Sequence, residues 1–227
     1  REVRFRLPLV LMNGAMLYDL AADRILESCE WAPETIARTL EICREGGKTP
    51  FLYRVEEGGK LDVVFTDLTS EGEREFYQKR TGKFPGMFRH LSAYPLTGAV
   101  YCSMQDTEVV LRPIQERLRD VADVDSVLYA DNYRENNWYL EIFSARAGKG
   151  NGLLRMKKWA GADTVTAFGD NYNDIAMLEK ADIACVVANG AAGVKDVADV
   201  IISSNEEDGV AVYIAADYAP DGKDDSH

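Results

Sequence analysis

The chain has 227 residues, of which 46% are hydrophobic and 28% charged, values typical of a globular protein. This length accommodates one or two domains with cores of their own and excludes a short linear module. Its 26 Lys and Arg against 38 Asp and Glu give a net charge of −12, and no stretch is rich in Lys or Arg. We therefore expect neither nucleic acid nor an anionic membrane as a partner.

The four cysteines, at positions 29, 43, 102 and 185, are widely scattered and form no Cys-x-x-Cys pair. This spacing favours reduced thiols over a disulfide framework, and thus a cytoplasmic location. The longest apolar run near the start, residues 7–12, is too short for the core of a signal peptide. No run approaches the roughly 18 residues that cross a bilayer.

The first predicted strand is the apolar run 7–12, which ends at Asn13 and Gly14. Because the run is apolar throughout, it predicts a strand buried on both faces of a parallel sheet. Residues 16–18 and 24–26 then predict either a hairpin or two short extended pieces that lead away from the core.

The following helices and strands adjoin like neighbours in an antiparallel α+β unit, without regular strand-helix-strand alternation. We assign residues 22–142 to this unit. The expected elements are a helix from Pro33 to the stop at Gly46, helices at 70–80 and 107–119, a strand at 98–103, and hairpins pairing 51–55 with 61–65 and 126–129 with 138–143.

The pattern changes at Lys149, where short apolar strands begin to alternate with helices. Such alternation predicts a parallel, doubly wound sheet. We expect one α/β domain, interrupted by the α+β insertion, to which residues 7–12 also belong. The expected elements are helices at 149–160, 174–180, 192–198 and 209–216 and strands at 164–168, 183–187 and 200–202, before a polar, mobile tail at 220–227.

The most informative segment is Gly-Asp-Asn-Tyr-Asn-Asp at residues 169–174. It follows a predicted parallel strand, and ligands bind such sheets outside the carboxyl ends of the strands. Mg²⁺ takes oxygen ligands and keeps several waters, so one or two aspartates suffice when a phosphate completes the shell. Asp170 is the better direct ligand. Asp174 is either a second metal-site residue or only a helix cap.

Two further positions are candidates for contact with a phosphate. Lys149 lies between glycines just ahead of a helix, where a lysine charge suits phosphate, although a solvated turn is the plainer interpretation. Asn13 ends the first strand and could face the same site or belong to a plain turn.

Other signals are weak. No phosphate-binding loop of the nucleotide type occurs, and two histidines in the whole chain exclude a histidine-rich metal site. His90 is expected at the surface. Asp67 resembles a nucleophile at a strand end, but it lies in the inserted unit and has no second aspartate nearby, so we reject it.

Several motifs in order resemble the haloacid dehalogenase-like (HAD) superfamily, and more narrowly its Cof-type phosphatases. They are Lys149-Gly150, residues 169–174, 188–190, 194–199 and 205–209, with residues 8–19 similar to the stretch before the cap domain. The resemblance implies an α/β fold with a doubly wound, Rossmann-like parallel-sheet core, incomplete at the N-terminus, and an inserted α+β cap. Residues 1–21 and 143–219 would be the two parts of the core, 22–142 the cap and 220–227 a flexible tail.

The resemblance also implies Mg²⁺-dependent hydrolysis of small phosphomonoesters through an aspartyl-phosphate, with sugar phosphates as the default substrates. In the family pattern Lys149 binds the phosphoryl group and steadies the nucleophile, and Asn173 contacts phosphate. Asp170 holds Mg²⁺, and Asp174 supports the metal site directly or through water. The cap would select the leaving group.

The sequence departs from the family at its amino end, where the motifs Asp-x-Asp-x-Thr and a following Ser or Thr are missing. They would occupy roughly 45 to 60 residues on ordinary element lengths. We expect a sequence truncated upstream of Arg1, and no phosphatase activity from the 227 residues alone. A non-catalytic remnant that binds a phospholigand or a partner protein, and a phosphotransferase such as a phosphomutase, remain alternatives. The oligomeric state is not readable.

Overall fold

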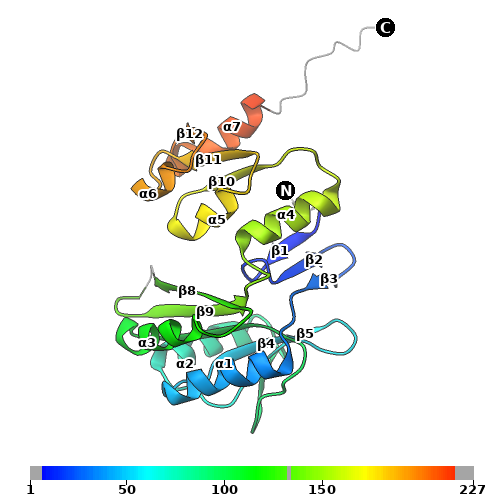
Figure 1. Ribbon diagram of the computed structural model, residues 1–227, viewed down its shortest axis with the longest axis vertical. Coiled ribbons are helices and arrows are strands. Elements are labelled where there is room, and N and C mark those ends of the chain that lie inside the picture. The colour runs from blue at the N-terminus through cyan, green and yellow to red at the C-terminus, as the bar shows by residue number, and fades with distance from the viewer. Residues whose placement is uncertain (1–6, 132–133, 218–227) are drawn as a thin grey trace. The chain divides into compact units, whose positions relative to one another are not determined.

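The computed structural model describes residues 7–131 and 134–217 (Figure 1). The predicted tail, residues 220–227, lies outside this range. The chain divides into two compact units, Arg1–Gly152 and Leu153–His227, called here the N-terminal and the C-terminal unit. Helix α4 (Lys149–Ala160) contains the division. No helix among the described residues combines the length and apolar character needed to cross a membrane.

The N-terminal unit begins with a small antiparallel sheet of order β1-β2-β3, formed by β1 (Leu9–Leu11), β2 (Met16–Asp19) and β3 (Arg24–Ser28). Of the two arrangements expected for residues 16–18 and 24–26, the structure has the hairpin, in which β2 pairs antiparallel with β3.

The prediction of a fully buried parallel strand at residues 7–12 is wrong. β1 pairs antiparallel with β2, and Val10 is 37% exposed. The cause is the turn, because Met12 and Asn13 have φ values of 51° and 49° and Gly14 follows at 83°. Left-handed backbone at successive positions returns the chain directly on itself, so the Asn-Gly pair is a hairpin turn.

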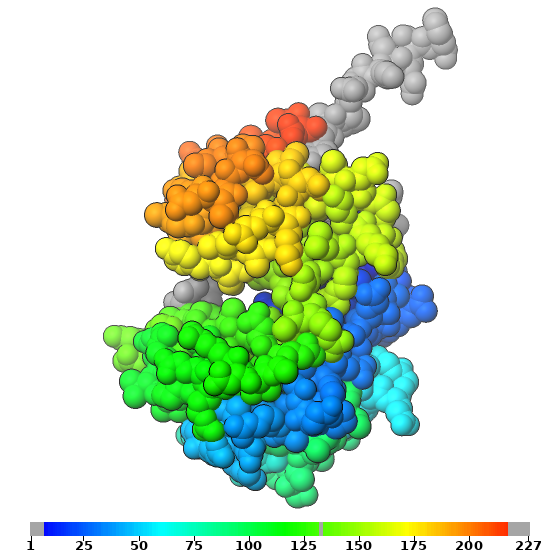
Figure 2. Space-filling view, viewed as in Figure 1, coloured from blue at the N-terminus to red at the C-terminus, as the bar shows by residue number. Residues whose placement is uncertain are grey.

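A six-stranded sheet forms the body of the N-terminal unit, in the order β6-β5-β4-β7-β9-β8. All neighbours are antiparallel except β5 and β6. Both predicted hairpins are confirmed, and the tip of the β4–β5 hairpin projects as a lobe of its own (Figure 2, cyan). The strands are β4 (Phe51–Val55), β5 (Leu61–Phe65), β6 (Phe88–His90), β7 (Ala99–Asp106), β8 (Val124–Ala130) and β9 (Trp138–Ser144).

Three helices cover this sheet. Helices α1 (Pro33–Glu45) and α3 (Glu108–Leu118) pack on one face, where Leu52, Cys102 and Leu140 join the largest core cluster. Helix α2 (Glu71–Thr81) packs on the other face, over the end formed by β4, β5 and β6. The remainder of that second face carries side chains of β4, β7, β8 and β9, because side chains alternate between faces along a strand.

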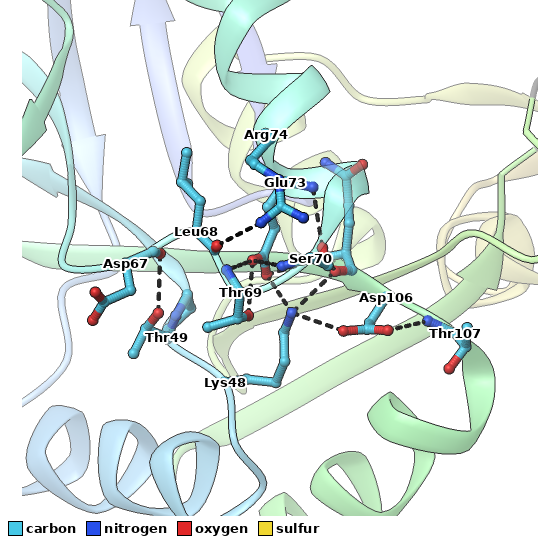
Figure 3. A network of polar contacts seen from close by, with 12 residues as sticks. Lys48, Thr49, Asp67, Leu68, Thr69, Ser70, Glu73, Arg74, Asp106 and Thr107 are labelled. Carbon is cyan, nitrogen blue, oxygen red and sulfur yellow. Dashed lines mark hydrogen bonds and ion pairs between the residues drawn. The ribbon is translucent and has the colours of Figure 1, made fainter.

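A buried ion network fixes the start of α2 to the end of β7 (Figure 3). Lys48 Nζ lies 2.7 Å from Glu73 Oε1 and 3.1 Å from Asp106 Oδ2, and the side chains of Lys48 and Glu73 are each 1% exposed. The other Glu73 oxygen accepts hydrogen bonds from the N–H groups of Thr69, at 2.7 Å, and Ser70, at 3.1 Å. Buried charges persist only when they are paired in this way, so the network is a structural element.

The C-terminal unit contains the predicted parallel sheet, in the order β10-β11-β12. Alternate residues of β11 join separate core clusters, Ala184 and Val186 in one, Cys185 and Val187 in the other, as expected for a strand covered on both faces. The elements are β10 (Thr166–Gly169), η1 (Tyr172–Asp174), α5 (Ile175–Leu178), β11 (Ile183–Val187), α6 (Ala192–Lys195), β12 (Val200–Ile202), η2 (Asn205–Glu207) and α7 (Gly209–Asp217).

Candidate active site

In the C-terminal unit, the loops after β10 and β11 meet at the carboxyl edge of the parallel sheet. The N–H of Ala191 donates to the carbonyl oxygen of Asp170 at 2.9 Å. A Cβ atom on Gly190 would lie 3.2 Å from that same oxygen, so the two loops are in close contact. Ligands bind open α/β sheets at this edge, where the sequence predicts Asp170.

The two aspartates of residues 169–174 have different environments. Asp174 is 7% exposed, and its Oδ2 accepts hydrogen bonds from the N–H groups of Asp170, at 3.2 Å, and Asn171, at 3.3 Å. Asp170 and Asn173 are exposed, and the Asp170 carboxylate has no hydrogen bond or ion pair to another described residue. Asp174 therefore shapes the loop, and Asp170 presents a carboxylate to solvent.

Gly169 makes this arrangement possible. A Cβ atom there would lie 2.8 Å from Asp174 Cβ and 3.1 Å from Leu178 Cδ1. Only a residue without a side chain lets Asp174 approach the end of β10 this closely. Gly169, the first residue of the motif, is thus required because no larger residue fits there.

The carboxylates of the loop match the small number of protein ligands that Mg²⁺ takes. Within 7–131 and 134–217, no three His, Cys, Asp or Glu residues converge to form a metal cage. Mg²⁺ does not need one, since it is commonly held by one or two carboxylates with water and phosphate oxygens. The exposed Asp170 carboxylate fits the direct ligand, while Asp174 is engaged in supporting the loop.

Lys149 and Asn13 lie near one another in the N-terminal unit. Lys149 is half-buried and starts α4, directly after Gly148 at φ 87°. A Cβ atom on Gly14 would lie 2.3 Å from the carbonyl oxygen of Gly148, so the β1–β2 turn is in contact with the start of α4. The helix N-terminus adds a positive potential beside the lysine.

The side chain of Asn13 is turned toward the six-stranded sheet. Its Nδ2 donates to Glu141 Oε2 at 2.8 Å, and the hydroxyl of Tyr129 donates to Glu141 Oε1 at 2.7 Å. Asn13 is thus a turn residue with a partner in β9, and its contact with phosphate stays a prediction.

The same carboxylate acts on a neighbouring tyrosine. Burial, reinforced by the Glu141 carboxylate, raises the pKa of Tyr101 well above its ordinary value.

Three other positions, Asn189, His90 and Asp67, each contact another residue of the structure. Asn189, after β11, donates to Asn205 Oδ1 at 2.6 Å and so ties two loops of the C-terminal unit together. His90 is exposed and contacts the ring of Phe65. Asp67 lies in the loop after β5, where its carbonyl oxygen accepts a hydrogen bond from Thr49.

Comparison with known proteins identifies the family. The model of the haloacid dehalogenase-like hydrolases matches residues 1–214. The chain belongs to this family. The crystal structure of SMU.1108c from Streptococcus mutans UA159 superposes on this chain with a TM-score of 0.70 at 23% identity, covering 95% of this chain and 78% of that one. The predicted α/β fold is confirmed.

Curated relatives match the chain over shorter segments. It is 38% identical over 85 residues to pyridoxal phosphate phosphatase YbhA of Escherichia coli (strain K12), and the match covers 35% of this chain and 31% of that protein. It is 30% identical over 115 residues to 5-amino-6-(5-phospho-D-ribitylamino)uracil phosphatase YitU of Bacillus subtilis (strain 168), covering 48% of this chain and 43% of YitU. The chain thus spans less than half of each of these relatives.

One polar residue that contacts Asn13 was not predicted from the sequence. Glu141 lies in the middle of β9 and is 128 residues from Asn13, its hydrogen-bond partner. A single acidic residue within an apolar strand was the only available signal, and it does not identify a partner so far along the chain.

Proposed function

We propose that the chain is part of a Mg²⁺-dependent phosphatase that hydrolyses small phosphomonoesters, with sugar phosphates as the default class. The observation that carries the proposal is the exposed Asp170 carboxylate at the carboxyl edge of the parallel sheet, on a loop held by Asp174. Family membership supports the same reaction class.

In the proposed reaction Asp170 would bind the metal, which when present neutralises charge on the phosphoryl oxygens. Asp174 would position Asp170 through its hydrogen bonds to the loop. Lys149 would hold the phosphoryl group by charge, and Asn173 and Asn13 would contact it through their amides. Phosphoryl transfer depends mainly on such alignment and charge neutralisation.

We propose that the nucleophile, an aspartate that forms an aspartyl-phosphate, is supplied by a segment outside these 227 residues, because the sequence contains no Asp-x-Asp-x-Thr. The chain alone is then inactive. The test is to incubate the purified chain with Mg²⁺ and a panel of phosphomonoesters and to measure released phosphate. No release above the rate without protein is expected. Turnover that requires Mg²⁺ and is lost in Asp170→Asn would contradict the proposed missing nucleophile.

The remaining features of the proposal concern organisation and partners. We propose that residues 22–142 form a cap inserted between core segments 1–21 and 143–219. The named activities of YbhA and YitU support a small phosphorylated metabolite as the substrate. The scattered cysteines support a cytoplasmic location, and the net charge of −12 supports the absence of nucleic-acid and membrane partners.

A second function is favoured by the absent nucleophile motif, namely a remnant of the same fold that binds a phospholigand or a partner protein without turnover. The two are distinguished by sequencing the DNA in frame upstream of the Arg1 codon. A strand ending in Asp-x-Asp-x-Thr supports the phosphatase, and an intervening stop codon supports the remnant.

A further inference from the structure

A cavity of about 380 Å³ lies on the second face of the six-stranded sheet, within the N-terminal unit. The sheet provides residues from β4, β7, β8 and β9, helix α2 provides Phe76 and Arg80, and the β1–β2 turn provides Met12. Among the described residues, five aromatic rings line it, those of Tyr53, Phe76, Tyr101, Tyr129 and Tyr139, and the only charged side chains are those of Arg80 and Glu141.

The strand register orders these rings. Tyr53 lies opposite Tyr101 and Tyr129 opposite Tyr139. The first pair meets edge to face with centroids 5.2 Å apart, and the second is stacked at 5.4 Å with an angle of 9° between the rings. Rings fixed on paired strands offer contact area at little further cost in conformational entropy.

Glu141 is the only carboxylate among the described lining residues. It accepts hydrogen bonds from Asn13 and from the hydroxyl of Tyr129, one on each oxygen, which leaves about one lone-pair site on each. Aromatic rings, and not charged acceptors, therefore make up most of the cavity wall.

Two polar side chains of the cavity can meet a ligand. Ser103 is 6% exposed, and its hydroxyl interacts with the hydroxyl of Tyr53 on the neighbouring strand. The Arg80 guanidinium lies 5.0 Å from the centre of the Phe76 ring and forms no ion pair with any carboxylate of the described residues. A planar guanidinium above a ring is suited to stack on, or donate to, a second flat group.

The cavity adjoins the Lys149 segment. Met12 lines it and precedes Asn13, whose side chain bonds to Glu141 on the cavity wall. Gly14 then contacts Gly148, directly before Lys149. A ligand in the cavity could therefore extend along this turn toward the start of α4.

We propose that this cavity binds the leaving group of the substrate and that this group contains a flat aromatic ring with a polar substituent. The ring would stack against the tyrosine rings, and the substituent would pair with Ser103 or Arg80. That the ring belongs to a leaving group rests on the proposed phosphatase function, and it replaces the default sugar phosphate by the phosphate ester of an aromatic alcohol. That the cavity selects a ring rests on its lining alone.

The test uses alcohols without phosphate, so that it does not depend on Mg²⁺ or turnover. Pyridoxine, an aromatic alcohol without the reactive aldehyde, and ribose, a saturated control, are titrated into the 227-residue chain and followed by ligand-observed NMR. Pyridoxine is expected to bind at least about tenfold more tightly than ribose, the scale of an aromatic contact. Ribose binding as tightly as pyridoxine, or no pyridoxine binding, would overturn the proposal.

Variants then locate the site. Tyr139→Leu is expected to weaken pyridoxine binding about tenfold, whereas Phe84→Ala, which removes an exposed ring of the same unit that does not line the cavity, should have no effect. Circular dichroism checks folding, and the exposed Arg80→Gln serves as a second variant that leaves the core intact, with Lys83→Gln as its control. Unchanged affinity in both Tyr139→Leu and Arg80→Gln would place the ring elsewhere and refute the assignment.

Pyridoxine binding in a chain whose extended form shows no phosphatase activity would refute the proposed function alone.

Discussion

The Lys48 network and the loop of residues 169–174 are both built from charged side chains, and they differ in what the protein supplies to them. In the network, Lys48 and Glu73 are buried and every charge has a partner from the chain. In the loop, Asp174 is buried and bonded, but Asp170 is exposed and has no partner among the described residues. A buried charge that the fold pairs completely cannot lose its partner without a large cost, and one that the fold positions but leaves open can act on a ligand.

The largest effect is expected from removing the charge of Lys48, the centre of the network. Lys48→Met should lower the free energy of unfolding by about 3–5 kcal/mol, because it leaves the Glu73 carboxylate buried and unpaired. Urea denaturation followed by circular dichroism measures the change. Lys48→Met combined with Glu73→Gln should recover part of the loss, since an amide oxygen can still accept from Thr69 and Ser70. A loss below about 1 kcal/mol in the single variant would show that the pair is not structural.

A smaller loss of stability is expected at Gly169, where the side chain of Asp174 lies close to the backbone. Gly169→Ala places a methyl group 2.8 Å from Asp174 Cβ and 3.1 Å from Leu178 Cδ1. We expect a destabilisation of about 1–3 kcal/mol, because the side chains must shift to accommodate it. Gly161→Ala, at a glycine with open space around its Cβ position, is a partial control that reports only the cost of its positive φ of 62°. Equal losses in both variants would argue against the steric role of Gly169.

The smallest effect is the pH dependence of a surface ion pair. The hydrogen bond from Lys157, at 2.5 Å, lowers the pKa of Asp182 below its ordinary value. A carboxyl group with a depressed pKa in the folded state stabilises the protein above its unfolded pKa, about 3.9, and loses this contribution as the pH falls through the lower, folded pKa. The difference in melting temperature between the wild type and Asp182→Asn should therefore shrink below about pH 4. A difference that stays constant down to pH 2 would contradict this assignment.

The sequence predicts some elements from local chemistry alone. The Gly58-Gly59 turn and the flanking apolar residues identify the β4–β5 hairpin, and the alternation of strands and helices identifies the parallel sheet. β1 is mispredicted because a short apolar run looks the same in a buried parallel strand and in a hairpin arm. β6 has three residues, too few to show a period.

The sequence predicts the candidate site only where its residues are close together along the chain. Asp170 and Asp174 follow one strand closely, so their grouping is local and visible in the sequence. Glu141 and the tyrosines of the cavity are brought together by cross-strand pairing across long sequence separations, and no local pattern marks them. Which of two neighbouring aspartates is buried also depends on tertiary contacts, here those of Gly169 and Leu178.

The central claim, that Asp170 is an open metal ligand, is tested most directly by NMR titration of the chain with Mg²⁺. We predict saturable amide shifts confined to residues 169–174 and the adjoining loop at 188–191, and their loss in Asp170→Asn. Asp163→Asn, which removes a carboxylate ahead of the amino end of β10 in the same unit, should leave the shifts unchanged. Identical Mg²⁺ shifts in the wild type and Asp170→Asn would contradict the account.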